Sequence, residues 1–462
     1  MPVTANTPKE KVRELQRKLY VCAKQSRKRR FHALYDRIYR SDVLWEAWRR
    51  VRSNGGAAGV DAETIRAIEE RGPGKFLAEI QVALQAGRYR PHPVKRRYIP
   101  KADGKQRPLG IPTVRDRVVQ MAAKLVMEPI FEADFQPCSY GFRPKRNPTQ
   151  ALEAIRVAGN QGYNFVVDAD IEGYFDNIQR ENLMELVKER ISDRRVLKLI
   201  RQWLEAGVME DGTVRETLAG TPQGGVISPL LANIYLNKLD RIWMARCRQL
   251  GILVRYADDL VALCRSASAA REALRRIELV MNRQGLRLHP VKTRLVDLRR
   301  GKESFVFLGC TFRKKRSIQR KPWVHFMQRW PSPKATKKLR ERVKELTSKR
   351  QSGQKVEQII AKLTPVLRGW GNYFRTGNAD REFNKMDYFV VKSLRRWQYR
   401  RGGQRATRRR PFTGDQLYGM GLHKLMGTVK YPAQATPRRS SLSRVPENGT
   451  HGLKGEIRNG LA

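Results

Sequence analysis

Acidic residues are scarce in this chain of 462 residues. It carries 44 Asp and Glu against 94 Lys and Arg, which gives a net charge of +50 and an isoelectric point of about 10.8. Solubility alone does not need such an imbalance, and a surface of this sign attracts polyanions. The composition therefore predicts a nucleic-acid partner.

Metal-binding cysteine pairs and long apolar runs are also missing. None of the five Cys is spaced as Cys-x-x-Cys, and the six His form no pair at ligand spacing, which argues against a zinc finger or a zinc-bound nuclease module. Scattered Cys are typical of a reducing cytosol. No stretch approaches about 18 apolar residues, so we expect a cytoplasmic protein with no membrane partner.

Two adjacent carboxylates stand inside one apolar segment. Tyr256–Asp259 lies in the run Gly251–Cys264, whose flanks are typical of two short strands joined by a turn. Carboxylates in hydrophobic surroundings must be paired or must hold a metal. Asp258 and Asp259 would then present hard oxygen ligands of the kind that Mg²⁺ prefers.

A second acidic strand is expected at Asn164–Ile171. Asp168 and Asp170 are two residues apart and share one face of that strand. A carboxylate from this strand could meet the first pair across a sheet and hold two Mg²⁺ about 3.5–4 Å apart, the arrangement for in-line phosphoryl transfer. Either motif alone could be a surface turn, whereas both in one chain favour a polymerase site.

A glycine-rich loop, Gly220–Pro229, lies between the two acidic motifs. It could be an ordinary helix start, with Ser228 as the cap and Pro229 in the first turn. It could equally be a loop whose glycines let a base pair approach the backbone closely.

The remaining pattern is mostly helical. We expect helices within 9–52, 60–90, 114–133, 226–244 and 267–284, and more helices after residue 171 to about 206. We expect a basic hairpin over 94–112, a strand pair over 303–313, and three helices near 333–350, 354–375 and 380–400. Residues 411–462 are weakly patterned, and we expect a small basic tail module or partial disorder there.

The order of these motifs resembles the reverse transcriptase family, and specifically the group II intron-encoded reverse transcriptase/maturase proteins of bacterial type. The matching stretches are Arg97–Lys101 with Gly110–Arg117, Ser139–Arg143, Asp170–Ile178, Gly220–Pro229, Tyr256–Asp259, Gly285–Lys292 and Phe305–Gly309. The segment Arg368–Phe374 lies where the family has its three-helix thumb, or domain X. The resemblance implies an α+β fold, a right-hand polymerase whose fingers and palm carry an antiparallel sheet, followed by a three-helix thumb/maturase domain.

The resemblance also implies roles for single residues. Asp170, Asp258 and Asp259 would be catalytic and, together with Ile171, would ligate two Mg²⁺ ions; Asp168 would be structural. The residues implied to bind the incoming nucleotide are Arg97, Lys101, Arg107, Phe175, Gln223, Gly224 and Lys292. With the basic runs added, the residues expected to contact nucleic acid are Arg27, Lys28, Arg29, Arg30, Arg143, Leu308, Gly309, Arg395, Arg396, Arg400 and Arg401.

Four regions follow from this reading. They are a basic helical extension over 1–75, fingers and palm over 76–320, a thumb/maturase domain over 321–405, and a basic DNA-binding tail over 406–462. The expected partners are group II intron RNA, an RNA template with a DNA primer, target DNA and dNTPs. The expected location is the bacterial cytosol or nucleoid.

The leading functional hypothesis is an RNA-directed DNA polymerase that binds its intron RNA, promotes splicing and takes part in retrohoming. Without the paired Cys and His of a zinc-dependent nuclease, we do not expect it to cut the second strand of target DNA. Two alternatives stay open: a reverse transcriptase of a diversity-generating or antiviral system, and an RNA-binding splicing cofactor that does not polymerise.

Overall fold

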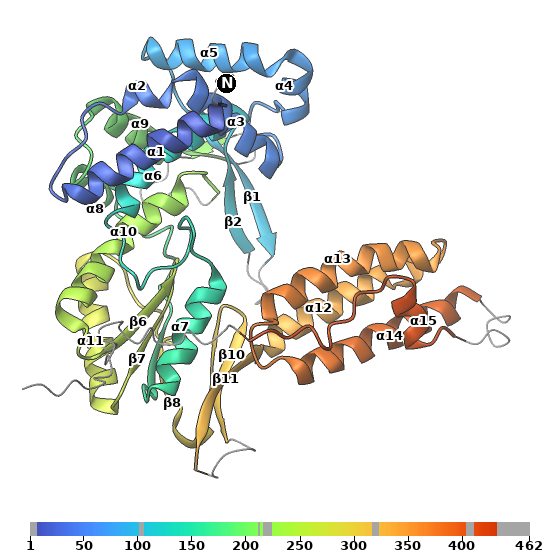
Figure 1. Cartoon of the computed structure of the whole chain (residues 1–462). Coiled ribbons are helices and arrows are strands. Elements are labelled where there is room, and N and C mark those ends of the chain that lie inside the picture. Colours follow the sequence, from blue (N-terminus) through green and yellow to red (C-terminus); the bar gives the residue numbers. More distant parts are fainter. Residues whose placement is uncertain are drawn as a thin grey trace, which may run out of the picture.

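A computed structural model describes residues 7–100, 106–210, 213–215, 224–316, 323–402 and 411–431. Its helices and strands build two hydrophobic cores (Figure 1). The first core lies among the N-terminal helices and one face of the central sheet. The second lies between the opposite face of that sheet and the C-terminal helices.

The N-terminal helices gather around the long helix α6 (Val114–Glu132). Helix α1 (Pro8–Gln25) starts at Thr7, which forms a capping box with Glu10, and its apolar stripe enters the first core. The other helices of this half of the chain are α2 (Tyr35–Ile38), α3 (Ser41–Asn54), α4 (Ile65–Arg71), α5 (Pro73–Gln85), α8 (Arg180–Lys188) and α9 (Arg194–Glu205).

A small sheet with the order β2-β1-β4-β5 projects from these helices (Figure 1). The expected basic hairpin is confirmed as β1 (Val94–Pro100) and β2 (Gln106–Ile111), which pair antiparallel. The sequence analysis missed β4 (Val208–Glu210), which runs parallel to β1, and its partner β5 (Thr213–Arg215).

The central sheet has the order β6-β7-β3-β8, and all its pairs are antiparallel. Because strand side chains alternate between faces, neighbours such as Val166 and Val167 enter different cores. Helix α11 packs against the sheet from the first core, and α7 from the second. The bounds are β3 (Phe165–Ala169), β6 (Gly251–Tyr256), β7 (Asp259–Cys264), β8 (Arg294–Asp297), α7 (Pro148–Asn160), α10 (Ser228–Ile242, continued by a π-helical turn Trp243–Cys247) and α11 (Ala267–Arg283).

The C-terminal part consists of a three-stranded sheet and a helical bundle that extends away from the rest (Figure 1). The sheet has the order β11-β10-β9, with β9 (Phe305–Phe307), β10 (Cys310–Arg316) and β11 (His325–Pro331). The expected helices are confirmed as α12 (Pro333–Leu346), α13 (Val356–Phe374) and α14 (Asp380–Gly402), and a short α15 (Gly414–Gly419) follows.

The mixed fold with antiparallel sheets is confirmed, whereas one expected boundary needs correction. The boundary at 75/76 falls inside α5, and helix α1 shares its core with α6, so residues 7–75 are no separate extension. Within the expected tail, Leu417, Leu422 and Leu425 are buried in the second core. The boundaries at 320/321 and 405/406 lie outside the described residues.

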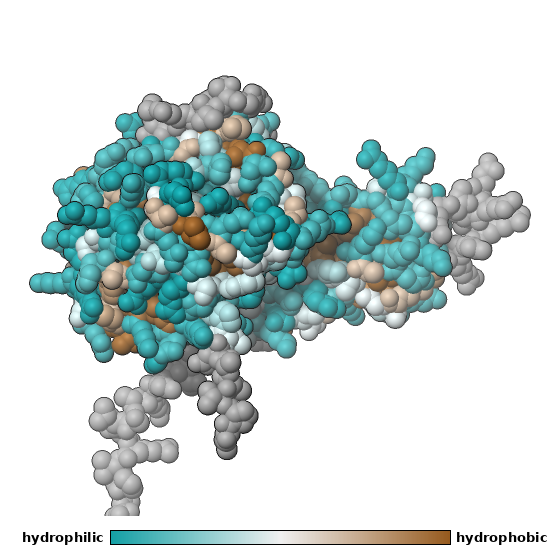
Figure 2. Space-filling model, turned by 90° about the horizontal axis from the view of Figure 1, so that it is seen from above, coloured by the Kyte–Doolittle hydropathy of each residue, from teal (hydrophilic) through white to brown (hydrophobic). Residues whose placement is uncertain are grey.

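The surface seen in Figure 2 is largely hydrophilic, in agreement with the high content of charged residues. Figure 2 shows a face covered largely by hydrophilic side chains, with hydrophobic ones in small separate patches. Among the described residues, no helix combines the length and apolar character that crossing a membrane requires.

Leu425 tests whether residues 411–431 belong to the helical bundle. Leu425 is fully buried, and a methyl group at Gly371 of α13 would clash with its side chain. We expect Leu425→Ala to lower the free energy of unfolding by ~2–5 kcal/mol, because it leaves a cavity. The neighbour Met426, 48% exposed, is the control, and Met426→Ala should change stability by less than about 0.5 kcal/mol. Equal effects in denaturant unfolding would show that the segment is not packed as described.

Candidate active site

The adjacent carboxylates lie at the β6–β7 turn. Tyr256 pairs with Asp259, so Ala257 and Asp258 form a two-residue hairpin turn. Ala257 has φ +57°, the left-handed conformation that such turns require at their first position. Asp258 is half-buried and Asp259 is exposed, so the turn presents both side chains at the edge of the central sheet.

A loop packs closely behind this turn. Ser139 forms a parallel bridge with Arg255, and a Cβ at Gly141 would clash with the backbone of Ala257. The position therefore requires glycine. Asn233 of α10 donates a hydrogen bond to the Gly141 carbonyl over 2.8 Å, which ties the loop to the helix.

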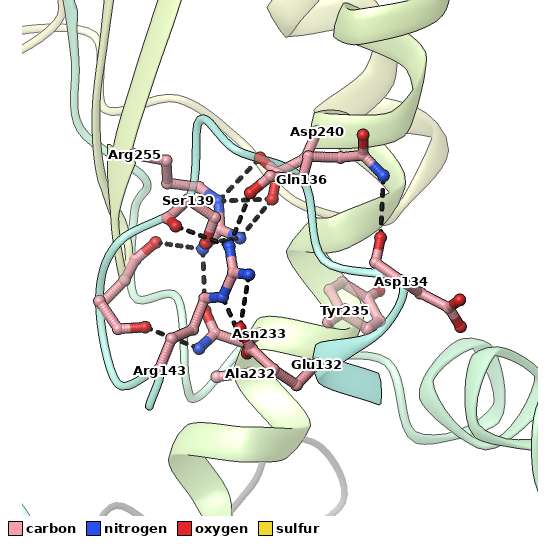
Figure 3. A network of polar contacts seen from close by, with 12 residues as sticks. Glu132, Asp134, Gln136, Ser139, Arg143, Ala232, Asn233, Tyr235, Asp240 and Arg255 are labelled. Atoms are coloured by element: carbon pink, nitrogen blue, oxygen red, sulfur yellow. Dashed lines mark hydrogen bonds and ion pairs between the residues drawn. The ribbon is translucent and has the colours of Figure 1, made fainter. Parts of the chain in front are cut away.

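The guanidinium of Arg255 is fully buried and forms hydrogen bonds that hold the backbone of the turn (Figure 3). It donates to the Ala257 carbonyl over 2.9 Å and to Asn233 Oδ1 over 3.0 Å, and it pairs with the buried carboxylate of Asp240 on α10. Burial alone lowers the pKa of Arg255, but Asp240 outweighs it, so the net shift is upward and the side chain is charged. An ion pair with no solvent exposure thus fixes the carbonyl next to Asp258.

Asp170 lies at the same end of the sheet. The last β3–β7 pair joins Ala169 to Leu260. Because the strands are antiparallel, Asp170 follows Ala169 at the same end of the sheet at which Asp259 precedes Leu260. The Asp170 carbonyl accepts from the His289 amide over 2.8 Å, and Ile171 forms a bridge with Leu288. The sheet therefore brings the two acidic motifs to one edge.

Two basic side chains neutralise the carboxylates of this strand. Lys292 Nζ lies 3.0 Å from Asp170 Oδ2, and Arg294 Nε lies 3.2 Å from Asp168 Oδ2. Burial raises the pKa of Asp168, although the hydrogen bond from Arg294 opposes this. Asp168 points its carboxylate to Arg294 on β8, which is the arrangement expected of a structural residue.

The donor set suits a hard cation that is shared with a substrate. Among the described residues, no three His, Cys, Asp or Glu side chains converge closely enough to hold a metal ion by themselves. Mg²⁺ is commonly bound by one or two carboxylates, with substrate phosphates and water completing its shell. Asp170 and Asp258 fit this requirement, and the contact of Lys292 with Asp170 shows that the site already accommodates a positive charge.

Comparisons with known proteins agree with this geometry. The family model "Reverse transcriptase (RNA-dependent DNA polymerase)" matches residues 99–312, and "Group II intron, maturase-specific domain" matches residues 336–412. Protein YkfC of Escherichia coli (strain K12) is 35% identical over 347 residues, which cover 66% of this chain and 89% of that protein. The chain belongs to the group II intron reverse transcriptase/maturase family.

Other relatives cover the chain only in part. Group II intron-encoded protein LtrA of Lactococcus lactis subsp. cremoris is 40% identical over 214 residues, 46% of this chain and 35% of LtrA. An uncharacterized 91 kDa protein in the cob intron of Schizosaccharomyces pombe is 28% identical over 77% of this chain and 52% of its own. The chain thus spans about a third of the length of LtrA. A solved chain from a partial Cas6-RT-Cas1--Cas2 complex is 26% identical and covers 54% of this chain and 42% of its own, with a TM-score of only 0.34.

Membership of this family makes the chain an RNA-directed DNA polymerase by class. The structure describes some of the residues that were expected to bind the nucleotide. Arg97 is exposed on β1, and Phe175 is half-buried with its ring 5.2 Å from that of Tyr174. Gly224 has φ +115°, and a Cβ there would clash with the Gly110 carbonyl of β2, so its backbone closely approaches that strand. Lys101, Gln223 and the side chain of Arg107 lie outside the described residues.

Most of the residues expected to contact nucleic acid are exposed. They are Arg27, Lys28, Arg29, Arg30, Arg395, Arg396 and Arg400, while the side chain of Arg401 lies outside the described residues. Arg143 is a correction. Its side chain is only 4% exposed, pairs with Glu132 over 2.7 Å and donates to the carbonyls of Gln136 and Ser139, so the guanidinium supports its own loop (Figure 3).

The sequence analysis missed the Arg255 network. The signal was present, because an arginine in the apolar run Gly251–Cys264 needs a buried partner. The partner, Asp240, lies 15 residues earlier on a helix, and nothing in the local pattern singles it out.

Arg255→Leu tests the role of this network in stability. The change leaves Asp240 buried without a partner, and we expect the free energy of unfolding to fall by about 3–5 kcal/mol. Arg241 is the control, since its ion pair with Glu189 is about half exposed and Arg241→Leu should cost less than about 1 kcal/mol. Similar losses for both variants in denaturant titration would contradict the buried-pair account.

Proposed function

We propose that this chain copies RNA into DNA, binds its group II intron RNA, promotes splicing of that RNA and takes part in retrohoming. The observation that supports the chemistry most directly is that β3 and the β6–β7 turn end at one edge of the central sheet. The maturase-specific match over 336–412 favours the intron role over a reverse transcriptase from a diversity-generating or antiviral system.

In this proposal Asp170, Asp258 and Asp259, with the Ile171 carbonyl, hold two Mg²⁺ ions together with the substrate phosphates. When bound, the ions activate the primer 3′-hydroxyl and neutralise charge on the α-phosphate and the departing pyrophosphate. The protein contributes a fixed geometry: Arg255 holds the Ala257 carbonyl, and the His289 amide holds the Asp170 carbonyl. Lys292, which pairs with Asp170 in this structure, would interact with the pyrophosphate once Asp170 ligates the ions.

The incoming dNTP meets three groups of residues. Arg97, Lys101 and Arg107 bind its triphosphate; Arg97 and Arg107 lie on the antiparallel strands β1 and β2, which supports this role. Gln223 and Gly224 border the new base pair. Phe175 stands under the sugar, where its ring excludes a ribonucleotide 2′-hydroxyl; the edge contact with Tyr174 supports a fixed ring position.

The larger regions take the following roles. The small β2-β1-β4-β5 sheet with the N-terminal helices forms the fingers, the central sheet forms the palm, and α12–α14 form the thumb, or maturase domain. The exposed run Arg27–Arg30 and the exposed residues Arg395, Arg396 and Arg400 bind intron RNA or target DNA through phosphates. Leu308 and Gly309 support the primer.

Primer extension tests the polymerase function. The protein is incubated with an RNA template, an annealed DNA primer, dNTPs and Mg²⁺, and cDNA is measured. Salt-dependent synthesis of cDNA supports the proposal. Tight RNA binding without any cDNA would instead identify a splicing cofactor that does not polymerise.

Asp258 provides the sharpest variant. We expect Asp258→Asn to reduce primer extension by at least about 100-fold. The amide would be a weaker ligand for the ions that neutralise charge in the transition state. Intron RNA binding and splicing should persist. Asp297 is the control, since it pairs with Phe165 at the opposite end of β3, and Asp297→Asn should leave extension unchanged. Loss of splicing in a folded Asp258→Asn protein would contradict the separation of the two roles.

Phe175 tests sugar selection. We expect Phe175→Ala to lower the ratio of kcat/KM for dNTP over rNTP by at least about tenfold, because the ring no longer opposes the 2′-hydroxyl. Phe165→Ala, at the far end of β3, should leave this ratio unaltered. An unchanged ratio for Phe175→Ala would remove its selective role.

A further inference from the structure

The turn between β9 and β10 is strained. Phe307 pairs with Cys310, so Leu308 and Gly309 form a two-residue hairpin turn, and both have positive φ, +47° and +74°. Such turns normally carry Asn-Gly or Gly-Gly, since a side chain like that of leucine is unfavourable in the left-handed region. A strained turn persists only where its surroundings hold it.

Two hydrogen bonds from outside the hairpin hold this turn. The hydroxyl of Tyr373, on α13, donates to the Leu308 carbonyl over 2.9 Å. The amide of Ser332, which caps α12, donates to the Gly309 carbonyl, also over 2.9 Å. Both carbonyls of the turn are therefore bound by the helical bundle.

The side chains of Tyr373, Leu308 and Tyr256 all pack against the second core. Burial raises the pKa of Tyr373, and the Asp259 carboxylate raises it further. The hydroxyl therefore stays protonated and remains a donor. Its ring lies 4.8 Å from that of Phe374 in an edge contact, which restricts its orientation.

The end of α13 is anchored to the rest of the protein. Arg329 of β11 is 1% exposed, and its Nη2 donates to the Thr376 carbonyl over 3.0 Å, just beyond the helix. The same group lies 3.3 Å from Glu153 of α7, which packs on the central sheet. Tyr373 thus projects from a helix whose end is fixed to β11 and α7.

We infer that Tyr373 is a positioning residue: its hydroxyl holds the strained turn Leu308–Gly309 in place, so that helix α13 of the maturase domain sets the surface that supports the primer end. This inference rests on the proposed function, in which that turn supports the primer. It links helix α13 to the polymerase site through the Tyr373 hydroxyl.

Tyr373→Phe tests this inference, because it removes the hydroxyl and keeps the ring. We expect hydrogen exchange of the Ser332 amide to quicken about two- to tenfold, the factor given by the loss of one net hydrogen bond. The kcat of single-nucleotide addition to a bound primer–template should fall by a similar factor, while the Kd for primer–template stays within about twofold. Tyr388, 68% exposed on α14, is the matched control, and Tyr388→Phe should change none of these quantities.

The two readouts separate the possible failures. Unchanged Ser332 exchange in Tyr373→Phe would overturn the inference, whether or not the protein polymerises. Faster exchange with wild-type kcat would overturn the link to primer position. A wild-type protein that makes no cDNA would reject the proposed function, whereas the exchange measurement would still decide whether the hydroxyl holds the turn.

Discussion

The candidate site depends on one buried ion pair. Arg255 and Asp240 have no solvent exposure, and the guanidinium also holds the Ala257 carbonyl, Asn233 and Ser139. Through these contacts, helix α10, the loop before α7 and the β6–β7 turn become one unit. A desolvated charge is costly unless every donor is used. Because every donor of the buried guanidinium must be used, its contacts hold the Asp258 turn in a single geometry.

A second constraint acts on the turn between β9 and β10. The Leu308–Gly309 turn is strained, and the bundle of α12 and α13 binds both of its carbonyls. One of the two turns is thus held by a charge network and the other by hydrogen bonds from the helical part. Leucine at a left-handed position and arginine in an apolar strand are each unfavourable alone, and each is held by residues distant in sequence.

The sequence predicted features that depend on neighbouring residues and missed contacts between residues that are far apart in the chain. Strand period and apolar flanks predicted the two acidic motifs, and the resemblance to a family singled out Asp170 and Asp258 within them. Arg143 was misassigned because its charge indicates phosphate contact, whereas its partner Glu132 is provided by the fold. Residues 411–462 were expected to form a small basic tail module or to be partly disordered because they are weakly patterned, and the burial of Leu417, Leu422 and Leu425 depends on partners distant in sequence.

The most direct test of the account is the structure of a complex with primer–template, dNTP and Mg²⁺. The account predicts metal ions bound between the carboxylates of Asp170 and Asp258, with Lys292 moved from Asp170 toward the triphosphate and the Arg255 contacts unchanged. Ions bound elsewhere, with Lys292 still paired to Asp170 in the presence of nucleotide, would contradict it.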